Sequence, residues 1–153
     1  MKSYQLLPRL ILPVLLSLSP ALVLCSPSVH AASQEEAQIK VVYHIDDSSR
    51  ASQAMRNIQN HLNGSPGVKI VVVTHGKGID FLLNNAKDER GNMYEASVAN
   101  LTNQGVDFRV CNNTLKGRNL TQDDVIQEAS VVPSGVAEVA RLQAREGYVY
   151  LKP

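Results

Sequence analysis

Cysteine and aromatic residues are scarce in this chain, which limits the metal sites it can form and the kind of core it can have. The 153 residues include two cysteines, Cys25 and Cys111, no tryptophan, and only 5% aromatic side chains. Two cysteines without a Cys/His spacing exclude a structural zinc site. The few aromatic side chains predict an aliphatic core, and a small domain of this kind often gains stability when copies associate.

Excess charge of either sign is also lacking. The chain has 15 basic and 14 acidic residues, a formal net charge of +1. A near-neutral chain gives no support for nucleic acid or an anionic membrane surface as a partner. We therefore expect no nucleic-acid partner, and no membrane partner for the mature form.

The first 31 residues have the pattern of a secretory signal peptide. Lys2 and Arg9 supply positive charge, an apolar run follows from Leu10 to Leu24, and residues 29–31 offer small side chains for cleavage. The apolar run is short for a membrane span, which needs about 20 residues. An uncleaved anchor is the alternative interpretation.

This pattern predicts three segments and a compartment. Residues 1–31 are the expected signal peptide, residues 32–38 a disordered lead, and residues 39–153 one folded domain. The expected location is the periplasm. Export would leave Cys111 as the only thiol, which cannot form a disulfide within the chain. In an oxidising compartment such a thiol is either buried and chemically inert or reactive and part of the protein's function.

Beyond the signal segment, apolar β-branched runs alternate with helical patterns. The expected strands are residues 39–45, 68–74, 106–111, 129–132 and 148–151. The expected helices are residues 48–63, 93–104, 114–118 and 134–145, with a helical turn at 81–83 and a short helix after the capping box that begins at Thr121. This alternation is typical of an α/β protein with a parallel sheet covered on both faces.

Polar residues follow the expected strands, where parallel α/β proteins bind their ligands. The sets, in strand order, are His44 with Asp46 and Asp47; His75 to Gly78; Cys111 with Asn112 and Asn113, then Lys116 and Arg118; and Pro133 to Gly135. We expect these residues, although scattered in sequence, to meet at one edge of the sheet.

Cys111 is the candidate nucleophile of this edge. The thiolate is the reactive form, and a free thiol titrates near pH 8.5. A helix that begins just after Cys111 would direct backbone N–H groups toward the sulfur. Nearby cations would lower the thiol pKa further, and Lys77, Lys116 and Arg118 are the candidates.

Three other features have two interpretations each. The loop at residues 75–78 is either an anion site, formed by its amides and Lys77, or an ordinary turn. The histidines and aspartates at residues 44–47, together with His75, either hold a metal or form a solvated loop in which Asp47 or Ser48 caps the next helix. The segment at residues 132–135 either holds a strained or cis peptide or marks a strand end and a helix cap. We expect no metal and no cofactor.

Several segments resemble the DsrE/DsrF-like sulfur-relay family. Phe108-Arg109-Val110-Cys111-Asn112-Asn113-Thr114-Leu115, with Gly117-Arg118 behind it, is similar to the family's cysteine-bearing strand. Residues 71–76 and 130–136 fit its second and fourth strand ends, and the resemblance extends over residues 39–152. Within the family, the chain resembles the exported, single-domain members most closely.

The resemblance implies a fold and an activity. The implied fold is a three-layer α/β/α domain with a five-stranded parallel sheet, a flavodoxin-like architecture. Members commonly form trimers or hexamers, so we expect a homo-oligomer. Cys111 corresponds to the cysteine that accepts sulfane sulfur as a persulfide and passes it to another protein.

The leading hypothesis is a periplasmic sulfur carrier, similar to a sulfurtransferase, whose donor and acceptor proteins the sequence does not identify. Cys111 would be the catalytic residue, and the surrounding ligand-binding candidates are His75, Lys77, Asn112, Asn113, Arg118 and Ser134. The alternative is a non-catalytic module of the same fold that binds a small ligand or a partner. A redox-sensing thiol is a third hypothesis.

Overall fold

The computed structural model describes residues 38–153. The predicted signal peptide and, apart from Gln38, the predicted lead lie outside the described residues. Within residues 38–153, no helix is long and apolar enough to cross a membrane.

A parallel five-stranded sheet forms the centre of the domain, in the order β4-β3-β2-β1-β5. The strands are β1 (Lys40–Asp47), β2 (Lys69–Lys77), β3 (Asp107–Cys111), β4 (Ala129–Val132) and β5 (Val149–Leu151). All five lie where the hydrophobic runs predict them, and the sheet is parallel as expected. Its central strand, β2, is the nearly continuous aliphatic run that two covered faces require.

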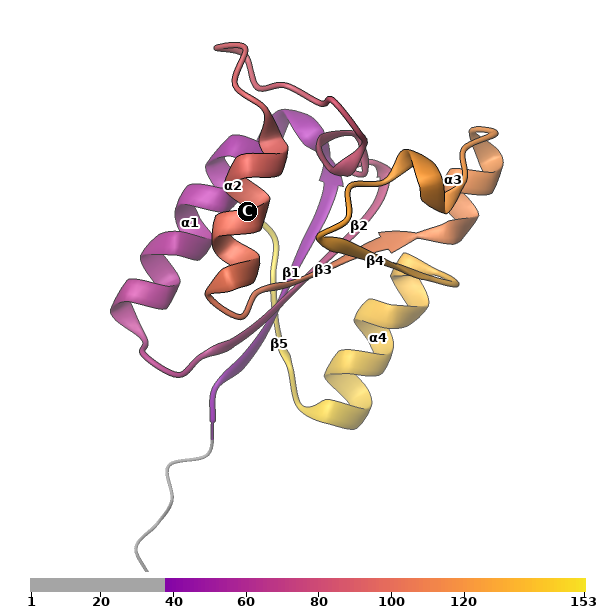
Figure 1. The fold of residues 1–153 in the computed structure, drawn as a ribbon. Helices are drawn as coiled ribbons and strands as arrows, with labels where there is room; N and C mark the ends of the chain where they lie inside the picture. The colour runs from indigo at the N-terminus through magenta and orange to yellow at the C-terminus, as the bar shows by residue number, and fades with distance from the viewer. Residues whose placement is uncertain (1–37) are drawn as a thin grey trace, which may run out of the picture. The chain divides into compact units, whose positions relative to one another are not determined.

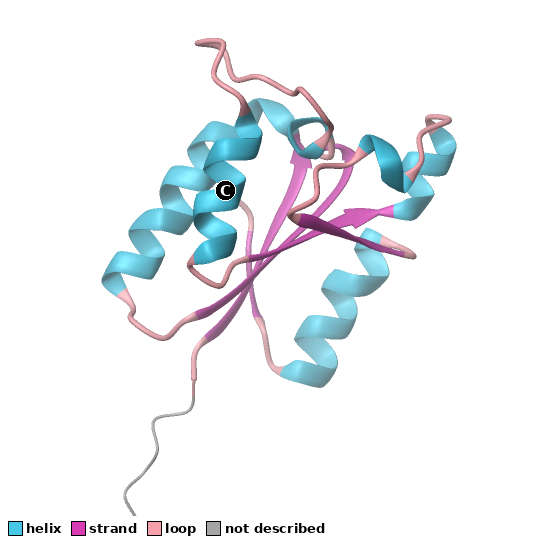
Figure 2. Cartoon of the chain, in the orientation of Figure 1, coloured by secondary structure: helices cyan, strands magenta, loops and turns pink. Residues whose placement is uncertain are grey.

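Helices lie on both faces of the sheet, which gives the expected three-layer α/β architecture (Figure 2). The helices are α1 (Ala51–Gly64), α2 (Tyr94–Asn103), α3 (Asn112–Gly117) and α4 (Gly135–Glu146). Figure 1 shows α1 and α2 together on one side of the strands and α4 on the other. The coverage of the two faces is therefore unequal.

Two predicted helices differ in detail from the structure. The first begins with a 3₁₀ turn at Ser48–Arg50, and α1 proper starts at Ala51. The capping box between Thr121 and Asp124 is present, but it closes a single 3₁₀ turn at Gln122–Asp124. The chain turns extended at Val125 because the next residue, Ile126, is buried and its amide donates to the Leu82 carbonyl.

The predicted caps of the helices are confirmed. Asp47 accepts from the Ser49 amide at 3.0 Å, so Asp47 rather than Ser48 caps the first helical turn. Ser134 caps α4 by accepting from the Ala137 amide, and Gly147 ends α4 in the left-handed conformation at φ +73°. The peptides of residues 132–135 are trans, so this segment is a strand end followed by a helix cap.

The core is aliphatic, as expected, and is split by the sheet. The larger cluster, on the α1 and α2 side, contains Ile45, Ile58, Val72 and Phe108 among others. The smaller cluster lies under α4 and consists of Val42, Val71, Val73, Val139, Leu142 and Tyr148. Because α4 alone covers this second face, polar side chains occupy the strand ends beyond it.

Candidate functional site

Cys111 ends β3 and is the residue from which α3 begins. It is a free cysteine with only 4% of its surface exposed. Its neighbour in β4 is Val132, one residue before the turn into α4. The thiol therefore lies at the carboxyl edge of the sheet, where the sequence predicts it.

Gly135 brings the start of α4 against this cysteine. A Cβ on Gly135 would lie 3.1 Å from the Cys111 Cβ, 3.1 Å from the Thr74 carbonyl oxygen and 3.2 Å from the His75 Cβ. Such distances are tighter than ordinary contact, so only glycine fits without a shift. The absence of a side chain allows the Gly135 amide to approach the sulfur.

The N–H and O–H groups of Gly135, Thr114 and Asn113 form a cradle beside the Cys111 sulfur, although the Cys111 side chain accepts no capping hydrogen bond from α3. Burial raises the pKa of the thiol, but the Gly135 amide, the hydroxyl and amide of Thr114 and the Asn113 amide outweigh it. The pKa of Cys111 therefore lies below its ordinary value, because these donors stabilise the thiolate. Since α3 has only six residues, we attribute the effect to these individual donors rather than to a helix dipole.

The Thr114 hydroxyl connects this cradle to the end of β2. It accepts from the Gly76 amide at 3.0 Å, which leaves its own proton free for the sulfur. Gly76 adopts φ +58°, a conformation that favours glycine. Gly78 packs so closely on β1 that a Cβ there would lie 2.0 Å from the Ile45 carbonyl oxygen. In the loop at residues 75–78, the Gly76 amide is therefore already engaged and Gly78 is held against β1.

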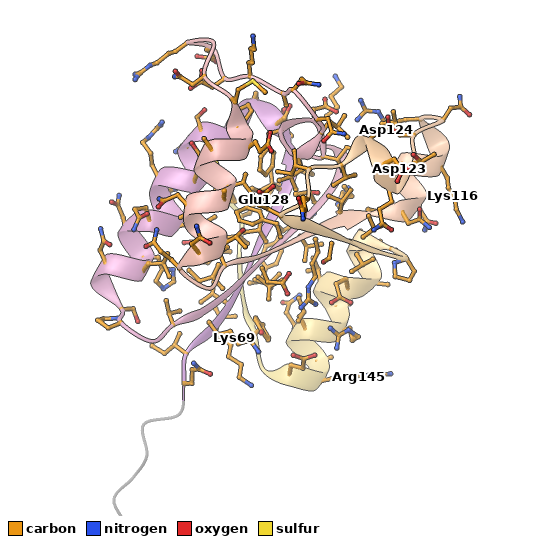
Figure 3. All side chains as sticks on the ribbon, in the orientation of Figure 1. Lys69, Lys116, Asp123, Asp124, Glu128 and Arg145 are labelled. Carbon is orange, nitrogen blue, oxygen red and sulfur yellow. The ribbon has the colours of Figure 1, made fainter. Side chains whose placement is uncertain are left out.

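The three candidate cations do not surround the thiol. Lys77 lies opposite Asp47 in the strand register, and Arg118 forms an ion pair with Asp80. Lys116 projects from α3 at the outer side of the domain (Figure 3). The groups that lower the thiol pKa most are the neutral donors of Gly135, Thr114 and Asn113.

The remaining site candidates have separate positions. Asn112 and Asn113 open α3, and the Asn113 amide helps to lower the pKa of the thiol. Ser134 acts as the helix cap of α4, one residue before Gly135. His75 lies near the end of β2 and is half-buried.

His75 belongs to a hydrogen-bonded chain that sequence reasoning missed. His75 Nε2 lies 2.6 Å from His44 Nε2, and His44 Nδ1 lies 2.9 Å from the Tyr150 hydroxyl. Burial, followed by the charge of His75, lowers the pKa of His44 below its ordinary value. The strand register brings these side chains together, because Tyr150 pairs with Val42, two residues before His44 and on the same face.

The residues weighed as metal ligands do not converge. Asp46 forms an ion pair with Lys152 at 2.7 Å, and Asp47 caps the turn that follows β1. Only His44 and His75 of the proposed set meet. In the described part of the chain, no group of three or more histidine, cysteine or acidic side chains is placed to hold a metal ion.

A polar hollow of about 680 Å³ opens at the end of β1 on the α1 side. Its walls are the start of α1 and the segment at residues 86–90, and its cationic side chains are Arg56, Lys87 and Arg90. Cys111 is not part of its lining. The thiol and this hollow therefore occupy different faces of the same sheet edge.

Comparisons with known proteins agree with this architecture. The protein of unknown function MTH1491 from Methanobacterium thermoautotrophicum is 34% identical, with a TM-score of 0.69 over 76% of this chain and 100% of its own. The ychN protein from E. coli shares the fold at 15% identity, with a TM-score of 0.61 over 76% of this chain and 99% of its own. A search of curated proteins gives no match.

A family model matches residues 38–153, which is the whole described domain. The matched span includes Cys111 with its donors and all five strands of the parallel sheet. The chain belongs to the DsrE/DsrF-like family.

Proposed function

We propose that this protein is a sulfur carrier that accepts sulfane sulfur on Cys111 as a persulfide and passes it to a partner thiol. Membership in the DsrE/DsrF-like family supports a role related to sulfur relay. The observation that carries the proposal is the position of Cys111 at the carboxyl end of β3, where Gly135 packs against its Cβ. The nearby donors of Gly135, Thr114 and Asn113 lower the pKa of its thiol.

The cradle matches the chemistry of each half of the reaction. In loading, the Cys111 thiolate attacks the outer sulfur of a donor persulfide, R–S–SH. The donor S–S bond breaks, a new S–S bond forms on Cys111, and R–S⁻ leaves and takes a proton from solvent. In unloading, a partner thiolate attacks the terminal sulfur and Cys111 leaves as a thiolate. The same donors would stabilise Cys111 as nucleophile and as leaving group.

Burial gives the carrier a further property. With 4% of its surface exposed, Cys111 contacts little solvent. A persulfide held there would be shielded from small oxidants and stray thiols, which suits a carrier that must keep its sulfur until the acceptor docks. Donor and acceptor would have to reach the edge formed by the ends of β3 and β4 and the start of α4.

Mass spectrometry after exposure to inorganic polysulfide tests this proposal. We expect a mass increase of one sulfur atom, located on the peptide that contains Cys111 and removed by a reducing thiol. The Cys25→Ser variant is the matched control and should load normally. A Cys111→Ser variant that gains sulfur to the same extent as the unmodified chain would exclude the proposal.

The polar hollow favours a second candidate, a module that binds a small anionic ligand. Of its four acidic side chains, Asp47, Asp80 and Asp88 already accept hydrogen bonds within the chain, and Glu89 is the fourth. No ion pair of Arg56, Lys87 or Arg90 occurs among residues 38–153, so these cations are available to a ligand.

Thermal stabilisation by inorganic phosphate or thiosulfate tests this second candidate. We expect it to persist in Cys111→Ala and to be lost in Arg56→Gln. Stabilisation that disappears in Cys111→Ala would instead assign the ligand to the thiol.

We propose further that the mature protein is periplasmic and forms a homo-oligomer. Ile39, Val149 and Leu151 support association, because they expose apolar surface on the edge strand β5 and beside it. Light scattering of the mature chain tests the assembly. A mass equal to one chain at micromolar concentration would exclude it.

A further inference from the structure

Three side chains from three strands are joined in series at the carboxyl edge of the sheet. Tyr150 of β5 contacts His44 of β1 at 2.9 Å, and His44 contacts His75 of β2 at 2.6 Å. Tyr150 is 38% exposed, whereas the two histidines are half-buried. The series therefore runs from solvent at the sheet edge toward the sheet centre.

The inner end of this series lies beside Cys111. The β2–β3 register pairs Thr74 with Val110, so His75 and Cys111 come next on neighbouring strands. Neighbouring strands are about 5 Å apart. The Cβ atoms of both residues also pack against Gly135, within 3.2 Å of where its Cβ would be. His75 is thus the member of the series that lies next to Cys111 across the β2–β3 edge.

The geometry of the series couples its protons. A separation of 2.6 Å between the two Nε2 atoms accommodates one proton between them. If Tyr150 donates to His44 Nδ1, then His44 Nε2 donates to His75 and His75 carries its proton on Nδ1. If every bond is reversed, His75 Nδ1 becomes an acceptor and the Tyr150 hydroxyl donates to water. Both arrangements keep both rings neutral.

We propose that Tyr150, His44 and His75 form a proton relay between solvent and the Cys111 thiol. His75 acts as the general base that takes the thiol proton through one water molecule, and His44 and Tyr150 act through it. A buried thiol has little water to receive its proton, which is the need that such a relay meets. The relevance of the relay to sulfur transfer rests on the proposed function.

The proton balance of one activation is complete. The thiol proton moves from Sγ through the water molecule to His75 Nδ1, and the Nε2 proton of His75 moves to His44 Nε2. The Nδ1 proton of His44 moves to the Tyr150 oxygen, and the Tyr150 hydroxyl proton leaves to water. The thiolate is formed, each relay residue keeps its number of protons, and no electron transfer occurs. The reverse sequence returns a proton to Cys111 after it has left as a thiolate.

Few other charges act on the relay. Asp46 and Lys152 face His44 and form an ion pair with each other. From α4, the charged group directed at this face of the sheet is Glu138, which pairs with Arg109 and Arg141. The lowered pKa of His44 agrees with a neutral ring at neutral pH, which a relay requires.

The pH profile of Cys111 alkylation by iodoacetamide tests the relay in a Cys25→Ser chain. With a general base, the rate constant of the parent should fall by clearly less than it does for a thiol that reacts only as free thiolate. Without one, only free thiolate reacts, and the rate falls about tenfold per pH unit. We expect the steeper profile in His75→Gln and in His44→Gln, and recovery of the shallow profile when free imidazole is added to His75→Ala.

His61→Gln is the matched control, because His61 also contacts a tyrosine hydroxyl, that of Tyr43, at 3.0 Å but on α1. It should keep the parent profile. His44→Gln decides the question if replacement of His75 disturbs the packing at Gly135. A His44→Gln chain with the parent profile overturns the relay. Because iodoacetamide transfers no sulfur, this result is independent of whether Cys111 carries a persulfide.

Discussion

The backbone of Gly135 and the side chain of Cys111 are in direct packing contact, since a Cβ on Gly135 would lie 3.1 Å from the Cys111 Cβ. This contact brings an amide from the start of α4 to a thiol at the end of β3. It is the tertiary contact through which α4, although distant in sequence, influences the pKa of Cys111.

Replacing Gly135 by alanine should therefore affect stability and thiol chemistry together. The added methyl group must displace the Cys111 Cβ, the His75 Cβ or the Thr74 carbonyl, and overpacking of this kind costs about 1–3 kcal/mol. The thiol pKa should rise because the Gly135 amide moves away. Urea unfolding and pH-dependent alkylation measure the two effects. Gly117→Ala is the control, since nothing lies within 4 Å of its added Cβ.

The Thr114 hydroxyl offers a test that adds no bulk. Thr114→Val removes the donor to Cys111 and leaves the Gly76 amide without its acceptor. We expect the pKa of Cys111 to rise, so that less thiolate is present at neutral pH, and stability to fall by about 1–3 kcal/mol. Thr102→Val is the matched control, because the buried Thr102 hydroxyl has no hydrogen-bond partner among residues 38–153. Equal effects of the two substitutions would contradict the account.

Acid should remove the contribution of Glu138 to stability. Arg141 and Arg109 hold the pKa of Glu138 below its ordinary value, against the opposing effect of burial, and only 11% of its side chain is exposed. A carboxyl with a lowered pKa stabilises the fold above its unfolded pKa of about 4.3, and loses this effect as pH falls through the folded value.

Glu138→Gln should thus destabilise the domain by about 1–2 kcal/mol at neutral pH and by much less near pH 3. Urea unfolding of parent and variant at both pH values measures the difference. If the difference in the free energy of unfolding between parent and Glu138→Gln is as large near pH 3 as at neutral pH, Glu138 acts through packing rather than through its charge.

Export gives a prediction outside the folded domain. A cleavable signal would end at Ala31, so protein recovered from the periplasm of a bacterial host should begin at Ala32. N-terminal sequencing or intact mass measures this directly. Recovery of the uncleaved chain in the membrane fraction would favour the anchor interpretation.

The local features of this fold could be predicted from the sequence because short-range chemistry determines them. Ser134 and Gly147 mark the ends of α4 through a cap and a left-handed turn, which only nearby residues influence. The unbroken run in β2 predicts a strand buried on both faces. The position of Cys111 follows from the same logic, since it ends a strand of a parallel sheet.

The environment of the thiol could not be predicted in the same way. The amides of Asn113 and Thr114 follow from a helix that begins after Cys111. The Gly135 amide comes from α4, and residue types give no signal of its approach because every residue except proline has an amide. The contact of His44 with His75 depends on strand order and register, which the pattern of hydrophobic residues leaves open. The cations favoured by sequence lie close in the chain, but Arg118 is paired with Asp80 instead.

The most direct test of the central claim is the mass of the Cys111 peptide after the protein has been treated with inorganic polysulfide and then with an acceptor thiol. The account predicts one added sulfur atom on Cys111 after the first step, and its quantitative loss with recovery of the free thiol after the second. Two results together would contradict the account. The Cys111 peptide would gain no sulfur, and the thiol pKa of Thr114→Val would equal that of the parent chain.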